Sequence, residues 1–157
     1  MTTIYIDADA CPVTRETLTI ARAHNVPVVM IANHSQNLSR HAGRKGVEIV
    51  QVSSGRDVAD FAIVTRLQSD DIVVTGDIGL AAMALGRARA LSFRGRVFAP
   101  ETIDMELALR HAEQQHRRGG GRTRGPSPFE DEDREHFIAT LKGMLDADGA
   151  QAAPEHA

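Results

Sequence analysis

The sequence has one cysteine, few aromatic residues and no long apolar run. Cys11 cannot form an intramolecular disulfide and has no Cys/His partners at zinc-ligand spacing, which fits a reducing compartment. No stretch approaches the roughly 18 apolar residues of a membrane span. The N-terminus also lacks the basic and apolar regions of a signal peptide. These absences predict a cytoplasmic protein without a membrane partner.

Neither sign of charge dominates the chain. The formal net charge is −3, so contact with nucleic acid would require a local basic patch. Aromatic residues make up 4% of the 157 residues, but hydrophobic residues make up 42% and can build an aliphatic core. The length suits a single domain. Neither a P-loop nor a G-x-G-x-x-G fingerprint is present.

Short apolar runs alternate with segments of helical periodicity. The predicted strands are 4–6, 26–32, 47–52, 72–74 and a short last one at 96–98. The predicted helices are 12–25, 57–67, 78–85 and 101–116. Such alternation is typical of an α/β fold with a mostly parallel sheet and helices on both faces, a three-layer sandwich. If the first and fourth strands are neighbours, the strand order is 3-2-1-4-5.

The C-terminal part begins with a glycine-rich basic stretch, 117–126, which predicts a flexible loop. A helix over 127–145 should follow, because Ser127, Pro128 and Glu130 form a capping-box start. The tail from residue 146 has little to bury, so we expect it to be disordered. The predicted organisation is one domain, 1–145, with a disordered tail, 146–157.

Aspartates follow the predicted strands. Asp7 and Asp9 come at the end of the first strand, and Asp77 follows the fourth. Asp57 and Asp60 share one face of the helix after the third strand. In open α/β sheets, ligand sites lie beyond the carboxyl ends of the strands, where the strand order reverses. Converging carboxylates repel one another unless a hard cation lies between them, so the pattern predicts a Mg²⁺ or Mn²⁺ site.

Simpler explanations exist for several of these acids. Asp77 precedes a helix and can be its N-cap, and Asp9 can cap the helix near Pro12. Asp57 also lies near a helix start, where acids are favoured. Capping explains Asp60 less well, and Asp7 ends a buried strand without a turn that requires it.

Four segments in this order resemble the YaiI/YqxD family, a bacterial group within the PIN-like nuclease superfamily. They are IDADACPV at 6–13, SGRDVAD at 54–60, VVTGDIGLAA at 73–82 and GRTRGPSPFEDEDREHF at 121–137. The resemblance covers roughly residues 3–145 and implies a PIN-like fold. It also implies a metal-dependent nuclease that cleaves phosphodiesters, often in RNA. By motif position, the catalytic acids are Asp7, Asp60 (or Asp57) and Asp77. Glu101 and Asp104 are candidates for a fourth acid.

The resemblance also bears on the basic loop, which contains Arg117, Arg118, Arg122 and Arg124. Its composition alone favours a solvated linker. Because GRTRGPSPF lies within a matching segment, we hypothesise that Arg122 and Arg124 contact substrate phosphates, with Arg117 and Arg118 as further nucleic-acid contacts.

Two other functions stay open. Asp7 and Asp9 after an apolar strand also resemble the nucleophile and general acid of haloacid-dehalogenase-type phosphatases. Against this, Ala81 stands where a second late acid is expected, and the only lysines are Lys45 and Lys142. A non-catalytic nucleic-acid-binding module is the other alternative.

Overall fold

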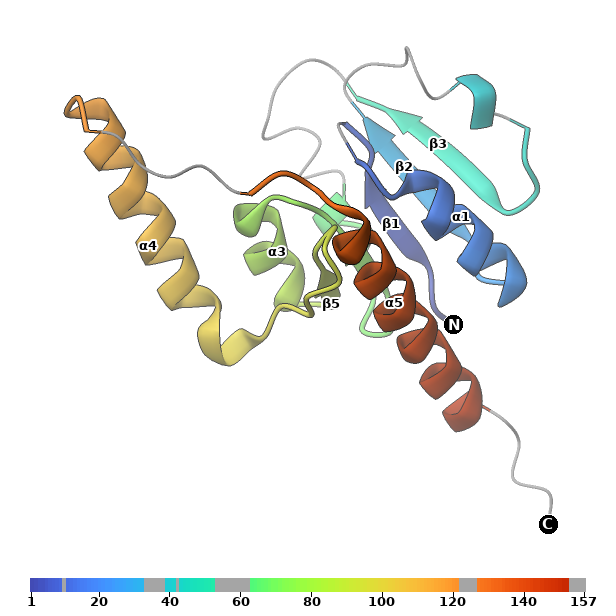
Figure 1. The fold of residues 1–157 in the computed structure, drawn as a ribbon. Coiled ribbons are helices and arrows are strands. Elements are labelled where there is room, and N and C mark those ends of the chain that lie inside the picture. Colours follow the sequence, from blue (N-terminus) through green and yellow to red (C-terminus); the bar gives the residue numbers. More distant parts are fainter. Residues whose placement is uncertain (10, 33–38, 42, 53–62, 122–126, 153–157) are drawn as a thin grey trace.

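The computed structural model describes residues 1–9, 11–32, 39–41, 43–52, 63–121 and 127–152. Its centre is one sheet with five parallel strands (Figure 1). The strands are β1 (Ile4–Asp7), β2 (Val28–Ala32), β3 (Val47–Gln51), β4 (Ile72–Val74) and β5 (Arg89–Leu91). The order β3-β2-β1-β4-β5 confirms the predicted topology.

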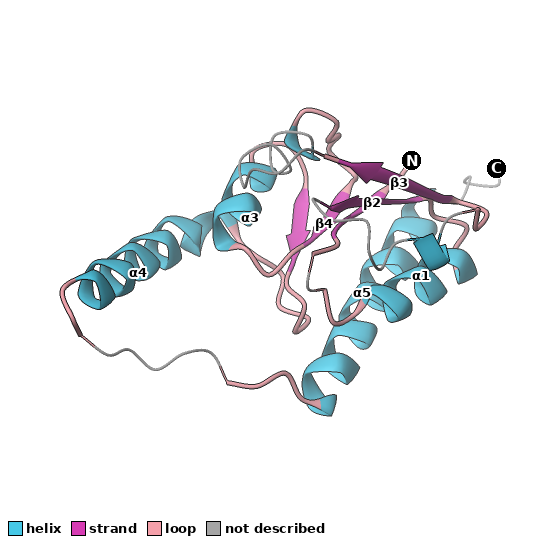
Figure 2. Ribbon diagram, turned by 90° about the horizontal axis from the view of Figure 1, so that it is seen from above, coloured by secondary structure: helices cyan, strands magenta, loops and turns pink. Residues whose placement is uncertain are grey.

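Helices cover both faces of the sheet, as predicted. Ile4 and Ile6 face α1 (Thr14–Ala23) and α5 (Asp131–Ala152) in one buried cluster. Tyr5, between them, lies in a second cluster with α3 (Ile78–Leu85). Figure 2 shows α1 and α5 on one side of the strands and α3 on the other. Buried on both faces, the central strands have the continuous apolar sequences of a parallel sheet.

The fifth strand was predicted at the wrong residues. It is Arg89–Leu91, whereas Val97 of the predicted strand forms only an isolated antiparallel bridge with Leu91. The Phe98 N–H donates to the Ala90 carbonyl at 3.0 Å, so this segment lies along the edge of β5. β5 contains no β-branched residue, and therefore its sequence has little of the composition typical of strands.

Two more helices differ from prediction in length or position. α4 (Pro100–Arg118) extends to Arg118, so that Arg117 and Arg118 are helical. α5 begins at Asp131, later than the predicted start. The predicted capping box is wrong: the Glu130 N–H donates to Asp133 Oδ2 at 2.9 Å, which is the reciprocal half of such a box three residues further on. A 3₁₀ turn, η1 (Ser39–His41), lies between β2 and β3.

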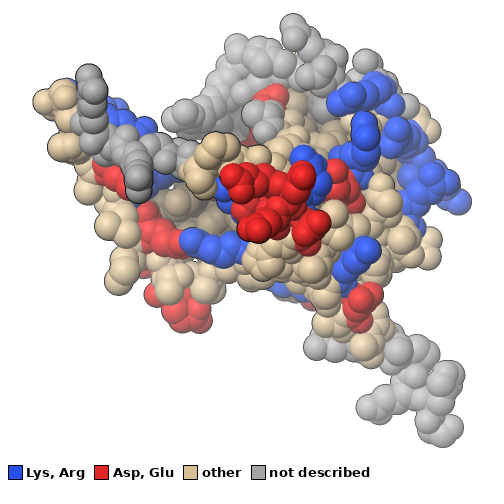
Figure 3. Space-filling view, viewed as in Figure 1, with Lys and Arg blue, Asp and Glu red and all other residues tan. Residues whose placement is uncertain are grey.

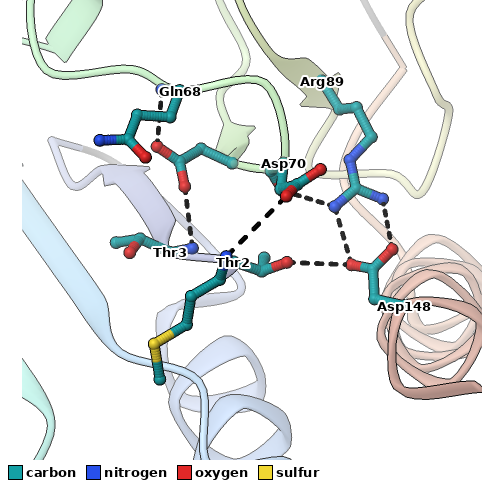
Figure 4. Close-up of polar contacts among 8 residues, drawn as sticks. Thr2, Thr3, Gln68, Asp70, Arg89 and Asp148 are labelled. Carbon is teal, nitrogen blue, oxygen red and sulfur yellow. Dashed lines mark hydrogen bonds and ion pairs between the residues drawn. The ribbon is translucent and has the colours of Figure 1, made fainter. Parts of the chain in front are cut away.

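α5 continues to Ala152, past the predicted end at residue 145. Asp148, near its end, accepts two hydrogen bonds from the Arg89 guanidinium at 3.0 and 2.8 Å and one from the Thr2 hydroxyl at 3.2 Å. Figure 4 shows these contacts beside Asp70. Asp146 lies 2.8 Å from His24 Nε2. Polar contacts with the sheet and α1 thus hold a helical end that has few apolar side chains to bury.

Among the described residues, no helix combines the length and apolar character needed to cross a bilayer.

Candidate active site

The strand order reverses between β1 and β4, and we refer to the carboxyl ends of these two strands as the switch point. The chain leaves β1 through α1 toward β2, and it leaves β4 through α3 toward β5, on the opposite side. The two helices also cover opposite faces of the sheet. Loops after the two strands therefore diverge, and ligands of open α/β sheets bind at such a point. Asp7 is the last residue of β1, and Asp77 follows β4.

One hydroxyl group connects the two aspartates. The Thr75 Oγ1 donates to Asp7 Oδ2 at 3.0 Å and accepts the backbone N–H of Asp77 at 3.0 Å. Thr75 is fully buried, so its rotamer is fixed by packing as well as by these bonds. The structure thus connects Asp7 and Asp77 through Thr75 at the carboxyl ends of β1 and β4.

Asp77 is also the N-cap of α3. Its Oδ1 accepts the Gly79 N–H at 2.8 Å, which confirms the predicted N-cap role of Asp77. Capping engages one carboxylate oxygen, and a monodentate metal ligand uses one oxygen as well. The two roles are therefore compatible in one side chain.

The turn that carries Asp77 is packed beneath an aromatic ring. A Cβ atom placed on Gly76 would lie 2.8 Å from Cε2 of Phe93, closer than real contacts allow. The residue between Thr75 and Asp77 therefore has no room for a side chain while Phe93 keeps its place.

Asp9 does not cap α1, contrary to that simpler explanation. The N-cap is Val13, and no side chain of a described residue caps this helix end. Asp9 is partly buried on the segment that follows β1. The role of Asp9 as a metal ligand stays a prediction.

Cys11 lies near the aspartates but is a poor nucleophile. Burial raises the pKa of its thiol, and the negative charge of Asp7 raises it further. A thiol that stays protonated at neutral pH is unreactive.

The oxygen donors at the switch point fit a hard cation. Asp7 and Asp77 offer carboxylate oxygens, and Mg²⁺ is commonly held by one or two carboxylates together with water and substrate phosphates. No group of three His, Cys, Asp or Glu side chains suited to a metal exists among the described residues. Asp57 and Asp60, the predicted additional ligands, lie outside them.

Of the four predicted basic contacts, the two that the structure describes lie away from the switch point. Arg117 and Arg118 lie at the end of α4 that points away from the sheet in both ribbon views. Arg122 and Arg124 lie outside the described residues. Glu101 and Asp104 are exposed on the first turns of α4.

Sequence patterns did not single out Thr75. The available signal was V-V-T-G-D, in which a hydroxyl residue directly follows an apolar strand and precedes the Gly-Asp pair. Its importance depends on the pairing of β4 with β1, which joins residues 68 positions apart.

Residues 5–147 match the model of a protein family described as uncharacterized BCR, YaiI/YqxD family. This chain belongs to the YaiI/YqxD family. A UPF0178 protein of Exiguobacterium sibiricum is 46% identical over 143 residues, which are 90% of this chain and 95% of the relative. A UPF0178 protein of Bacillus thuringiensis subsp. konkukian is 40% identical over 143 residues, 90% of this chain and 97% of the relative. No solved structure matches this member of the family significantly.

Proposed function

We propose that this YaiI/YqxD protein is a metal-dependent nuclease that hydrolyses phosphodiesters in RNA or single-stranded nucleic acid. The supporting observation is the joining of Asp7 and Asp77, from neighbouring parallel strands, by the Thr75 hydroxyl at the reversal of strand order. Two oriented carboxylates at such a point suit a divalent cation and a phosphate better than a neutral ligand.

Asp7 and Asp77 would hold Mg²⁺ or Mn²⁺, with Asp9, Asp57 and Asp60 completing the ligand set or orienting water. When bound, the cation would supply an activated water and stabilise charge on the phosphate. Thr75 would fix Asp7 through the bond to Oδ2, and the cap on Gly79 would fix Asp77. Outer contacts of this kind keep ligands in place between turnovers.

The test is cleavage of a labelled single-stranded RNA in Mn²⁺ or Mg²⁺ by wild type, Asp7→Asn and Asp77→Asn. We expect each variant to lose about 100-fold or more in rate, since amide oxygens are weaker ligands for hard cations. Asp131→Asn, an exposed acid at the start of α5, makes the same charge change elsewhere and controls for contaminating nuclease.

Cleavage at the wild-type rate by Asp7→Asn would contradict the proposal and favour a non-catalytic binding module. Hydrolysis of a small phosphomonoester, with a phosphoaspartate trapped at Asp7, would instead identify the phosphatase alternative.

A further inference from the structure

A second charged surface lies on α1, η1 and the turn before β3. It consists of five exposed cations, Arg15, Arg22, Arg40, Arg44 and Lys45. Figure 3 shows basic side chains gathered on this side of the molecule. We refer to these five residues as the basic face.

Within the described part of the chain, no acid is paired with a cation of the basic face. Two nearby acids have other partners: Glu16 of α1 pairs with Arg134 at 2.8 Å, and Glu48 of β3 pairs with Arg66 at 2.9 Å. Basic side chains gathered on one face are the electrostatic footprint of a polyanion site.

The basic face contains a groove with both charged and apolar walls. It has a volume of about 740 Å³ and lies between α1 and the segment that enters β3. The lining residues are Arg22, Arg44 and Lys45, together with Leu18, Thr19, Ala23 and Val47. Cations can bind phosphates there, while the aliphatic side chains offer a surface for a sugar or a base.

We propose that the basic face binds the phosphate backbone of a single-stranded nucleic acid, with one nucleotide in the groove between α1 and β3. The apolar lining favours a single strand over a duplex, whose bases are stacked inside, and over inorganic polyphosphate, which has no base.

The position of α1 connects the basic face to the candidate active site. This helix begins shortly after Asp7 and Asp9 and runs back to the opposite edge of the sheet. Arg15 is therefore near the carboxyl ends of the strands, where Asp7 lies. Arg22 is two helical turns further along α1. A nucleic-acid strand bound along α1 would lead toward Asp7 and Asp77. This consequence rests on the proposed nuclease function, whereas the binding itself does not.

The test measures binding of a fluorescent single-stranded 15-nucleotide RNA by anisotropy in EDTA, where no cleavage occurs. The triple variant Arg22→Ala, Arg44→Ala, Lys45→Ala should raise Kd at least tenfold. It should also flatten the slope of log Kd against log salt by about 2, since each phosphate contact to a single strand contributes about 0.7. All three residues are exposed, so circular dichroism should show an unchanged fold.

The matched control is the triple variant Arg87→Ala, Arg110→Ala, Lys142→Ala. It removes the same charges from exposed positions on other elements and should keep the wild-type Kd. Equal weakening by both triple variants would overturn the proposal, as would equal competition by polyphosphate or by a duplex. Asp7→Asn should bind RNA as wild type does. If the wild-type protein binds RNA but does not cleave it with Mn²⁺ present, only the proposed nuclease function is contradicted. If the triple variant Arg22→Ala, Arg44→Ala, Lys45→Ala cleaves RNA as efficiently as wild type, only the proposed role of the basic face is contradicted.

His41 provides an independent reporter beneath the basic face. Its side chain is buried, and its Nδ1 has no hydrogen-bond partner among the described residues. Burial and the charges of Arg44, Arg40 and Arg15 hold the pKa of His41 below its usual value. Phosphates bound to these arginines should raise that pKa in an NMR titration, and an unchanged pKa at saturating RNA would count against the assignment.

Discussion

At the scale of single residues, the Thr75 side chain makes two hydrogen bonds from one buried position. It donates to Asp7, accepts from the N–H of Asp77 and fills a fully buried position behind both. Each bond constrains a different aspartate, so loss of the hydroxyl would loosen both carboxylates at once. A buried N–H left without an acceptor costs free energy in addition.

We expect Thr75→Val to lower the free energy of unfolding by about 1–3 kcal/mol. It should also weaken Mn²⁺ binding by about 10–100-fold, because outer contacts orient metal ligands. Denaturant unfolding and calorimetric titration with Mn²⁺ measure the two effects. Thr75→Ser keeps the hydroxyl and should restore metal affinity.

Thr17→Val is the matched control for stability. Thr17 is fully buried in α1, and its hydroxyl donates to the Val13 carbonyl at 2.8 Å. Its loss should cost stability without changing Mn²⁺ affinity. Equal affinity in Thr75→Val and Thr17→Val would refute the positioning role of Thr75.

Gly95 is required by both its conformation and its surroundings. Its φ is +87°, in the left-handed region that L side chains rarely adopt. A Cβ there would lie 2.6 Å from the Phe137 nitrogen and 2.7 Å from the His136 carbonyl carbon of α5. Backbone atoms inside a helix cannot move aside as a flexible side chain can.

Gly95→Ala should therefore destabilise the protein by about 2–5 kcal/mol, from left-handed strain and overpacking against α5. Gly143→Ala, on the exposed side of α5 with nothing within 4 Å of its Cβ, should stabilise by about 0.5–1 kcal/mol. Thermal and urea unfolding compare the two. A neutral Gly95→Ala would show that the 92–96 turn is not pressed against α5.

At the scale of elements, α5 is attached to the rest of the fold in two different ways. Phe137, Leu141 and Leu145 recur at helical spacing and are buried against the sheet. Beyond them, Asp146 and Asp148 contact His24 and Arg89. Apolar packing fixes the first part, and polar contacts extend the helix where apolar residues end.

The contact between α5 and α1 should depend on pH. Hydrogen bonds to Asp146 and to the Ile20 carbonyl raise the pKa of His24, and both ring nitrogens face acceptors at 2.8–2.9 Å. A folded pKa above the unfolded value of about 6.5 means that the contribution is complete below that pH. It is lost as pH rises through the folded pKa.

His24→Asn should therefore reduce stability at pH 5.5 and have less effect at pH 8.5. The difference should stay below about 1 kcal/mol, because Asp146 is largely exposed. Urea unfolding at the two pH values measures it. Glu135→Gln, an exposed acid on α5, should show no such pH dependence; a His24→Asn effect that is equal at both pH values would disprove the ion pair.

At the scale of the whole molecule, the sequence predicted what depends on local pattern. The helix 78–85 and the strand 72–74 were placed at their exact residues, because apolar runs and the Gly-Asp boundary mark their ends. The prediction for β5 was wrong, because the sequence Arg89-Ala90-Leu91 has no strand signal of its own. These residues form a strand through their pairing with β4. Contacts over long separations, such as Thr75 with Asp7, have no local signal.

No local sequence pattern indicates the basic face either. Its cations are spread over residues 15–45 and come together only because α1 and the entry to β3 lie side by side in the fold. The four arginines of 117–124, by contrast, are close together in the sequence itself.

Metal binding should be visible in the stability of the whole fold, independently of activity. A ligand that binds only the folded state stabilises it by about 2.7 kcal/mol at 100 times its Kd. For a domain of this size, that corresponds to roughly 5–11 °C in Tm. Mn²⁺ should therefore raise the Tm of wild type and Asp131→Asn, and fail to raise that of Asp7→Asn or Asp77→Asn. Because both aspartates are fixed by one hydroxyl, Thr75→Val should need more Mn²⁺ for the same rise. An equal rise in Asp7→Asn and wild type would place the bound Mn²⁺ elsewhere on the protein.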